Sequence, residues 1–324
     1  MPKMSSEPHE HATACKRITV NGPTMGTRWS ASVDADNTMD LAALHQDLAA
    51  AVERVDTQMS PWKPDSDLMR LNRAPVDEWV DLPAEILEVL DGALDVHRLS
   101  AGAFDPCVGA LVNAWGFGAV RDAPDAQAIR AARQPWPRRA EAGLELDRCA
   151  GRVRKRVPLQ IDLCGIAKGY AVDRMATVLQ QHGVRHALAA LDGELRAVGT
   201  QASGAPWAVA LERPETARRA VHGVVELEDL AVATSGDYRR YLEVGGTRLA
   251  HTMDPRHCAP VRNSVASVTV LARSCMHADA WATALLVAGP DEGLAMAQRM
   301  GLDVLFLLRR AEGLVELGLG RLGR

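Results

Sequence analysis

A stretch near the middle of the chain combines charged side chains and glycines at a predicted junction between a strand and a helix. Residues 161–173 read IDLCGIAKGYAVD. Apolar residues at 158–161 predict a short buried strand, and helical spacing predicts a helix over 167–181. Asp162 lies at the end of the strand and Lys168 in the first turn of the helix, so both charges are expected at the junction.

Such a junction is suited to binding an anion. The backbone N–H groups at a helix N-terminus and the positive end of the helix dipole point to one place. Lys168 adds a positive charge, and Asp162 adds a negative one, so a phosphate accompanied by a metal ion fits better than a bare anion. The alternative is that Gly165 and Gly169 only permit close packing and that Lys168 is a solvated side chain.

Asp279 and Thr283 form a second candidate pair. They are four residues apart in a helix predicted over 277–287, and therefore project from one face. A carboxylate with a hydroxyl one turn away offers the hard oxygen ligands that Mg²⁺ prefers, completed by phosphate and water. Alternatively, Thr283 bonds its own helix backbone and Asp279 caps the helix start.

Two further residues could contact a ligand. His251, which precedes Asp254 and Pro255, could hydrogen-bond a phosphate or transfer a proton near neutral pH, or it could be a partly buried structural histidine. Met25 lies between two predicted strands, where it could stack on a flat ligand or simply belong to the core.

Composition and missing motifs exclude several classes of protein. The sequence contains no Walker A motif and no G-x-S-x-G nucleophile elbow. A net charge of −4 without a basic cluster gives no support for nucleic-acid binding. Six scattered cysteines without a C-x-x-C pair argue against a zinc ribbon or a disulfide framework.

Nothing in the sequence predicts a membrane span or a secretory signal. No run of about 18 apolar residues is present, and the polar N-terminus lacks the apolar core of a signal peptide. As the sequence stands, we expect a cytoplasmic protein. Residues 1–17 are expected to be a disordered tail, followed by a single catalytic domain of two lobes over 18–324.

The candidate residues are carried by a mixture of helices and strands. The first long helix is expected to run from a cap at residue 37 or 38 to residue 59. Further helices are expected at 67–71, 84–99, 107–115, 125–133, 167–181, 277–287 and 291–300, with a short one at 236–241. Strands are expected at 18–20, 28–33, 144–146, 152–156, 186–191, 194–198, 207–211, 224–227, 267–271, 304–308 and 314–317. Because the elements do not alternate as βαβ units, they favour an α+β fold with mixed, largely antiparallel sheets.

Seven segments of the sequence occur in an order that is typical of one protein family. They are 25–27 (MGT), 59–72, 102–118, 161–173, 233–238 (ATSGDY), 251–255 (HTMDP) and 278–285. In these segments and in their order, the chain resembles the ApbE family, the FAD:protein FMN transferases. The resemblance covers Thr24 to about Val287, which is most of the chain.

The resemblance implies an enzyme that binds FAD in a cleft between two lobes, with Mg²⁺ near the pyrophosphate. It implies transfer of FMN to a Thr or Ser hydroxyl of an acceptor flavoprotein, with release of AMP. Two alternatives share the same site: an FAD pyrophosphatase, in which water replaces the hydroxyl, and a non-catalytic FAD-binding maturation protein.

The resemblance also implies roles for individual residues. Met25 and Trp62 would pack on the flavin, and three neighbours, Ala103, Phe104 and Asp105, would line the FAD site. Asp162 and Lys168 would hold the nucleotide, with Asp162 at the adenosine part. The Gly165 carbonyl, Asp279 and Thr283 would bind Mg²⁺. His251 would lie at the phosphates, and it is, with Asp279, a candidate catalytic residue.

Some positions depart from the family pattern. Trp62 stands where the family usually has Tyr, and stacking survives that change. Asp192-Gly193-Glu194 stands where the family often has Gly-Gly-Asp, and Cys164 replaces a common Gly. These changes affect the details of substrate geometry rather than the expected fold.

Overall fold

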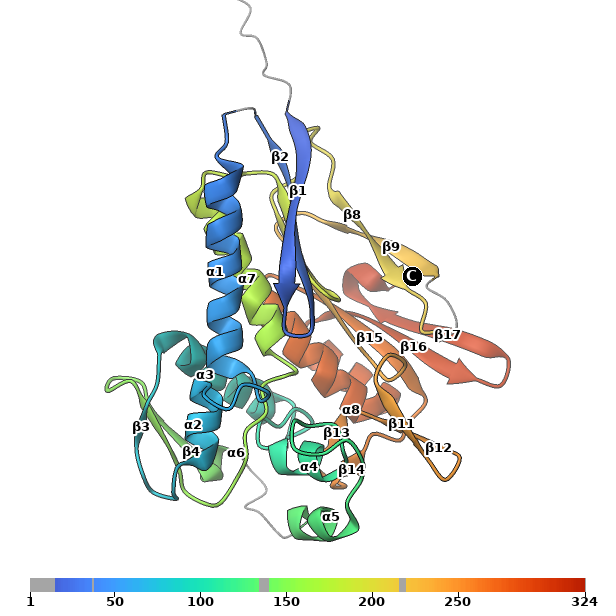
Figure 1. The fold of residues 1–324 in the computed structure, drawn as a ribbon. Coiled ribbons are helices and arrows are strands. Elements are labelled where there is room, and N and C mark those ends of the chain that lie inside the picture. Colours follow the sequence, from blue (N-terminus) through green and yellow to red (C-terminus); the bar gives the residue numbers. More distant parts are fainter. Residues whose placement is uncertain (1–14, 37, 134–139, 216–219, 324) are drawn as a thin grey trace, which may run out of the picture.

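An eight-stranded sheet runs through the computed structural model, which describes residues 15–36, 38–133, 140–215 and 220–323. Each strand is antiparallel to its neighbours. Their order across the sheet is β1 (Lys16–Thr24), β2 (Thr27–Ala35), β6 (Ala187–Leu191), β7 (Glu194–Val198), β10 (Ala231–Gly236), β15 (Val265–Ala272), β16 (Asp303–Arg310) and β17 (Gly313–Leu319) (Figure 1).

Three long helices cover one face of this sheet: α1 (Leu41–Met59), α7 (Ala167–Gln181) and α8 (Cys275–Met300). α1 packs on α7, α7 packs on α8, and α8 packs on β10 and β15 (Figure 1). The main hydrophobic core lies between the helices and the sheet. It holds the two faces together because burial of apolar surface contributes about 25 cal/mol per Å².

A hairpin of β8 (Trp207–Glu212) and β9 (Val221–Leu227) covers part of the opposite face. Its buried side chains, among them Trp207 and Leu227, form a second core with Val232 and Leu271 of the central sheet. With both faces covered, β15 is buried along nearly its whole length, which explains why six of its eight residues are apolar.

Further elements lie in the lower part of Figure 1. The helices there are α2 (Asp67–Arg73), α3 (Ala84–Leu99), α4 (Gly109–Ala114), α5 (Ala126–Ala132) and α6 (Ala140–Gly143). The short sheets pair β3 (Val80–Asp81) with β5 (Arg152–Lys155) and β4 (Leu144–Asp147), β11 (Tyr241–Val244) with β12 (Thr247–Ala250), and β13 (Met253–Asp254) with β14 (Ala259–Pro260). A 3₁₀ turn, Gly320–Leu322, ends the described chain.

The predicted α+β fold with largely antiparallel sheets is confirmed. α3 and α7 have the predicted ends, and the strands predicted at 186–191 and 194–198 are β6 and β7, joined by a turn at Asp192-Gly193. The helices predicted at 277–287 and 291–300 are the two halves of α8, which is kinked at Gly289. None of the helices in the described part of the chain is long and apolar enough to cross a membrane.

The strand predicted at 158–161 is wrong. Gln160 makes only an isolated bridge with Val108. The backbone of Ile161 instead bonds the side chain of Asn72, which accepts its N–H at 2.7 Å and donates to its carbonyl at 2.9 Å. An amide side chain thus replaces a neighbouring strand, which the local sequence does not reveal.

Other predicted boundaries are also wrong. α1 is capped by Asp40 rather than by residue 37 or 38. The expected tail included residues 16 and 17, but β1 begins at Lys16, and Arg17 is fixed by an ion pair of 2.7 Å with Asp34; residues 1–14 lie outside the described part. The helix predicted at 236–241 is absent, because Gly236 pairs within β10 and Asp237 is held by two bonds of 2.7 Å from Arg309.

Candidate functional site

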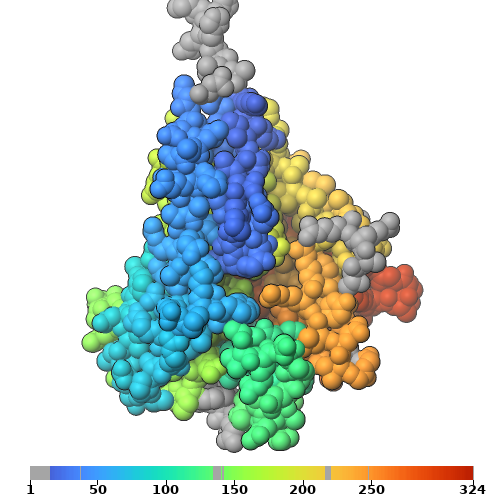
Figure 2. Space-filling model, in the orientation of Figure 1, coloured from blue at the N-terminus to red at the C-terminus, as the bar shows by residue number. Residues whose placement is uncertain are grey.

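A cleft of about 1260 Å³ contains all the site residues that the sequence predicts. It opens between the β1–β2 hairpin, the α4 segment and the β11–β12 segment, where the space-filling view is hollowed (Figure 2). Its lining includes Met25, Trp62, Ala103, Phe104, Asp105, Asp162, Gly165, Lys168, His251, Asp279 and Thr283. Residues from six separate parts of the sequence therefore meet in one place.

Asp279 lies at the closest approach of two helices. Its Oδ2 accepts the backbone N–H of Gly169 at 3.0 Å, and the residue is buried. A Cβ on Gly169 would lie 2.3 Å from the carbonyl oxygen of Cys275 and 2.8 Å from Cβ of Asp279. Gly169 is thus required for packing, as one of the alternatives held, and it also supplies a hydrogen bond to the carboxylate.

Burial raises the pKa of Asp279, while Lys168 and the Gly169 N–H oppose this shift. The alternative that Asp279 caps its helix is wrong, since the N-cap of α8 is Ser274, whose hydroxyl accepts the His277 N–H. The Asp279 carboxylate is therefore left to face the cleft.

Thr283 lies one turn further along α8. Its Oγ1 is 3.0 Å from the hydroxyl of Ser235 in β10, rather than bonded to its own helix as the alternative proposed. A Cβ on Gly165 would lie 3.1 Å from this Oγ1 and 3.3 Å from the Phe104 ring. The missing side chain at Gly165 leaves the oxygen of Thr283 accessible to a small ligand.

Lys168 is paired rather than solvated. Its Nζ lies 2.6 Å from Oε1 of Glu194, a buried residue at the start of β7, and 4.0 Å from Oδ2 of Asp192. Burial alone would lower the pKa of Lys168, but the carboxylates of Glu194 and Asp279 outweigh it and raise this pKa. Lys168 therefore stays charged across the physiological pH range.

One of the two carboxylate oxygens of Glu194 lacks a hydrogen bond within the described part of the chain. Its Oε2 is buried and has no hydrogen-bond partner among the residues that the structure describes. Burial raises the pKa of Glu194, and the charge of Lys168 works against that shift. An unpaired buried carboxylate oxygen is costly, so it is expected to meet a cation or a hydrogen-bond donor when the cleft is filled.

Three of the backbone donors at the N-terminus of α7, where we predicted an anion site, already have acceptors within the protein. The N–H groups of Ile166 and Ala167 both donate to the carbonyl of Leu163, at 3.1 and 2.9 Å, and that of Gly169 donates to Asp279. These backbone donors are used inside the protein. An anion in the cleft would therefore be bound more by the positive charge of Lys168 than by the helix terminus.

Two carboxylates brace the turns beside this terminus. Asp162 accepts the N–H of Cys164 at 2.8 Å, and Asp105 accepts the N–H of Cys107 at 2.7 Å. The backbone joins the two turns, because the Asp162 N–H donates to the Pro106 carbonyl at 2.8 Å. Burial raises the pKa of Asp105.

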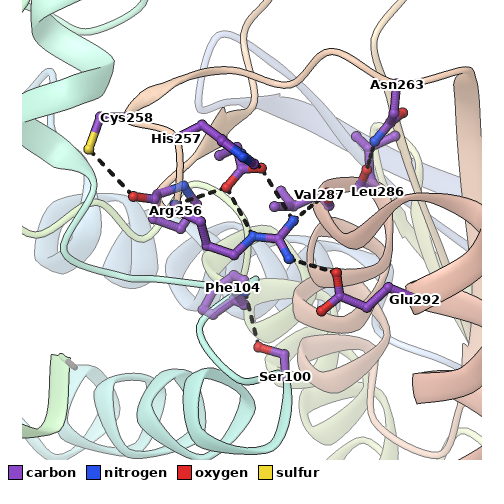
Figure 3. Close-up of polar contacts among 11 residues, drawn as sticks. Ser100, Phe104, Arg256, His257, Cys258, Asn263, Leu286, Val287 and Glu292 are labelled. Atoms are coloured by element: carbon purple, nitrogen blue, oxygen red, sulfur yellow. Dashed lines mark hydrogen bonds and ion pairs between the residues drawn. The ribbon is translucent and has the colours of Figure 1, made fainter. Parts of the chain in front are cut away.

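The loop with Ala103 and Phe104 is tied to α3. The Phe104 N–H donates to the hydroxyl of Ser100 at 3.0 Å (Figure 3), and His97 Nδ1 donates to the Phe104 carbonyl at 2.9 Å. Nε2 of His97 accepts the Ala140 N–H at 3.1 Å, so both ring nitrogens are hydrogen-bonded. These bonds fix the loop that places the Phe104 ring at the cleft.

His251 is held in a defined tautomer. Its Nδ1 lies 3.1 Å from the carbonyl of Arg240, and its backbone N–H donates to the same carbonyl at 3.3 Å. A carbonyl only accepts, so Nδ1 carries the proton and Nε2 of the neutral ring has a lone pair. Burial of the ring lowers its pKa. His251 is therefore neutral at pH 7 and able to accept a proton.

Met25 and Trp62 lie at the rim of the cleft. Met25 and Gly26 form the two-residue turn between β1 and β2, with φ of 45° and 71°. A left-handed conformation is uncommon for a residue with a side chain, and it holds Met25 at the hairpin tip. Trp62 is 48% exposed, and the guanidinium of Arg240 lies 5.9 Å from its ring centroid.

Sequence reasoning missed the partners of these residues. From the sequence, Glu194 stands out only as a departure from the family pattern and Ser235 only as part of the segment 233–238, yet they contact Lys168 and Thr283. Glu194 directly follows the turn between β6 and β7. The pairings depend on the order of strands in the sheet, which the sequence did not provide.

Known proteins share this architecture. The model of the ApbE family matches residues 25–306. The FAD:protein FMN transferase of Vibrio cholerae is 37% identical over 93% of this chain and 90% of its own length, and that of Escherichia coli K12 is 32% identical over 94% and 88%.

Solved structures of other proteins have the same fold as this chain. The flavin transferase ApbE from Vibrio cholerae superposes with a TM-score of 0.85 at 34% identity, covering 94% of this chain and 97% of that one. The apo flavinyl transferase ApbE of Pseudomonas stutzeri has a TM-score of 0.83 at 36% identity, with coverages of 94% and 95%. This chain belongs to the ApbE family and is, like these curated relatives, an enzyme of the transferase class.

Proposed function

We propose that this protein transfers FMN from FAD to a Thr or Ser hydroxyl of an acceptor protein and releases AMP. The observation that carries the proposal is the convergence of Asp279, Thr283 and a neutral His251 on one cleft of about 1260 Å³. Sites for drug-sized ligands span about 300–1,000 Å³, so the cleft has room for a dinucleotide with the acceptor group beside it.

The residues of the cleft suit Mg²⁺. The described residues contain no cluster of three His, Cys, Asp or Glu side chains that would hold a transition metal. The available oxygens are the Asp279 carboxylate, the Thr283 hydroxyl and the Gly165 backbone carbonyl, and the space that a Cβ would fill at Gly165 adjoins the Thr283 oxygen. Few protein oxygens completed by phosphate and water are typical of Mg²⁺ sites.

Bound there, Mg²⁺ would neutralise charge on the phosphates of FAD. In the transfer, the acceptor oxygen forms a bond to the phosphorus of the FMN half, and the bond from that phosphorus to the bridging oxygen breaks. AMP leaves with the bridging oxygen and its electron pair. His251 Nε2 takes the hydroxyl proton, which suits a base whose pKa is lowered by burial.

The remaining residues bind and orient FAD. Met25 and Trp62 flank the flavin, and Ala103, Phe104 and Asp105 form its wall. Asp162 binds the adenosine half. Lys168 has three N–H donors, of which Glu194 takes one, so the others can reach a phosphate.

Mass spectrometry tests the proposal. The protein is incubated with FAD, Mg²⁺ and a recombinant flavin-accepting domain, with the Thr→Ala form of that domain as control. An FMN adduct on the Thr form alone supports transfer. AMP and FMN without an adduct indicate the pyrophosphatase, and bound but unchanged FAD indicates the maturation protein; either result overturns the proposal.

A further inference from the structure

Helix α8 is kinked shortly after the residues that face the cleft. Gly289 has φ 79° and ψ −179°, and Pro290 follows it. Proline has no N–H, so the carbonyl of Leu286, four residues earlier, lacks its helical partner. A carbonyl left without a donor costs stability unless another group bonds it.

Side chains from outside the helix bond the carbonyls at this kink (Figure 3). Asn263 Nδ2 donates to the Leu286 carbonyl at 2.9 Å, and Arg256 Nη2 donates to the Val287 carbonyl at 3.2 Å. The Asn263 amide is oriented, because its Oδ1 also accepts the N–H of Val265 at 3.0 Å.

Arg256 joins the kink to the chain that follows His251. Its Nε and Nη2 each lie 3.2 Å from an oxygen of Asp254, and its Nη1 lies 2.7 Å from Glu292 in the second half of α8. Burial alone would raise the pKa of Asp254, but Arg256 and His257 outweigh it and lower this pKa. Asp254 is therefore a charged, buried partner of Arg256.

Asp254 lies three residues after His251, and α8 carries both Asp279 and Thr283 before the kink. We propose that Arg256 and Asn263 are positioning residues, which bind the segment after His251 to the kink of α8 and thereby fix His251 relative to Asp279 and Thr283. The inference rests on the proposed function. The kink is required for these contacts, because in a straight helix the same carbonyls would accept N–H groups of the helix itself.

The proposal predicts a loss of rate rather than of FAD affinity. Arg256→Ala is expected to lower kcat for FMN transfer by about 10- to 100-fold, because displacement of a reacting group by about 1 Å has that effect. Asn263→Asp keeps the shape but removes the donor, and a loss of about 3- to 10-fold is expected. The KM for FAD should change by less than about threefold in both, since neither Arg256 nor Asn263 is among the residues that line the cleft.

Arg154→Ala is the matched control. Arg154 also makes two bonds to one carboxylate, at 3.0 and 3.1 Å from Glu145, but in the small sheet away from the cleft. Its side chain is 23% exposed, compared with 33% for Arg256. Unchanged kcat in Arg154→Ala separates the positioning role from the general loss of an ion pair.

A double-mutant cycle distinguishes positioning from structure. If Arg256 acts through His251, then Arg256→Ala in a His251→Ala background should reduce the residual rate by less than about twofold. Independent, multiplicative losses would overturn the proposal, as would a full wild-type kcat in Arg256→Ala.

Amide hydrogen exchange provides a readout that does not depend on transfer. Protection of residues 251–254 should fall at least about tenfold in Arg256→Ala and remain unchanged in Arg154→Ala. If the wild type transfers no FMN, the proposed function fails, and exchange still tests the contact. Unaltered protection in both variants would refute the positioning role alone.

Discussion

The carboxylate of Asp279 accepts the backbone N–H of Gly169 at 3.0 Å, across the interface between α8 and α7. One turn away, Asp173 of α7 accepts the N–H groups of Cys275 and Met276 at 2.9 Å each. The later residue of α7 contacts the earlier residues of α8, so the two helices are antiparallel. Hydrogen bonds at two places along the interface fix their register. The position of Asp279 is therefore set by α7 as much as by its own helix.

Gly169→Ala should break this register. The new Cβ would lie 2.3 Å from the carbonyl oxygen of Cys275, which belongs to the backbone and cannot rotate away. We expect a loss of about 2–3 kcal/mol in the free energy of unfolding, measured by urea denaturation, with weaker activation by Mg²⁺. Gly223→Ala is the control, because no atom lies within 4 Å of its Cβ position. Equal stability of the two variants would contradict the packing argument.

Removal of Lys168 should cost more than removal of both partners of its ion pair. Lys168→Ala leaves the buried carboxylate of Glu194 uncompensated, for a loss of about 2 kcal/mol once the 29% exposure of the lysine is taken into account. The double variant with Glu194→Gln should recover more than half of this loss in the same denaturation experiment. Lys63→Ala, on the surface, should cost under about 1 kcal/mol. A double variant less stable than Lys168→Ala would argue against the pair.

The transfer rate should depend on the protonation of His251. Burial lowers the pKa of His251, and the base needs the neutral ring. The rate should therefore be on its plateau at neutral pH and fall only as the pH drops through this lowered pKa, below about 6.5. Kinetics between pH 5 and 8 measure this limb. His251→Asn should lose at least about 100-fold in rate and lack the limb; a variant with the same acid limb would exclude His251 as the base.

Thr283→Val tests the hydroxyl near Gly165. Valine has nearly the same shape but offers no oxygen to a cation and leaves Ser235 without its 3.0 Å partner. The Mg²⁺ concentration for half-maximal activity should rise about tenfold, whereas Thr283→Ser should remain near the wild type. Identical Mg²⁺ titrations of the valine variant and the wild type would remove Thr283 from the proposed metal site.

Much of the fold follows from local sequence patterns. Helical spacing predicted α3 and α7, and alternation of apolar residues predicted the strand with Trp29, because each depends on one buried face. The strand at 158–161 was wrong because Asn72, from a distant helix, bonds the backbone of Ile161. No local pattern encodes such a long-range contact.

The candidate site was predicted as a set of residues but not as a network. The spacing of Asp279 and Thr283 correctly indicated one helix face. It could not indicate that Gly169 and Ser235 bond them, or that Glu194 neutralises Lys168. These partners come from another helix and from strands β7 and β10, and only the tertiary structure brings them together.

The central claim is that Asp279 supports metal-dependent transfer of FMN in this cleft. The most direct measurement is mass spectrometry of the acceptor domain after incubation with FAD and Mg²⁺, using the wild type and Asp279→Ala side by side. The account predicts an FMN adduct that forms with the wild type, disappears when Mg²⁺ is chelated, and is absent with Asp279→Ala. A full yield of adduct with Asp279→Ala would contradict it.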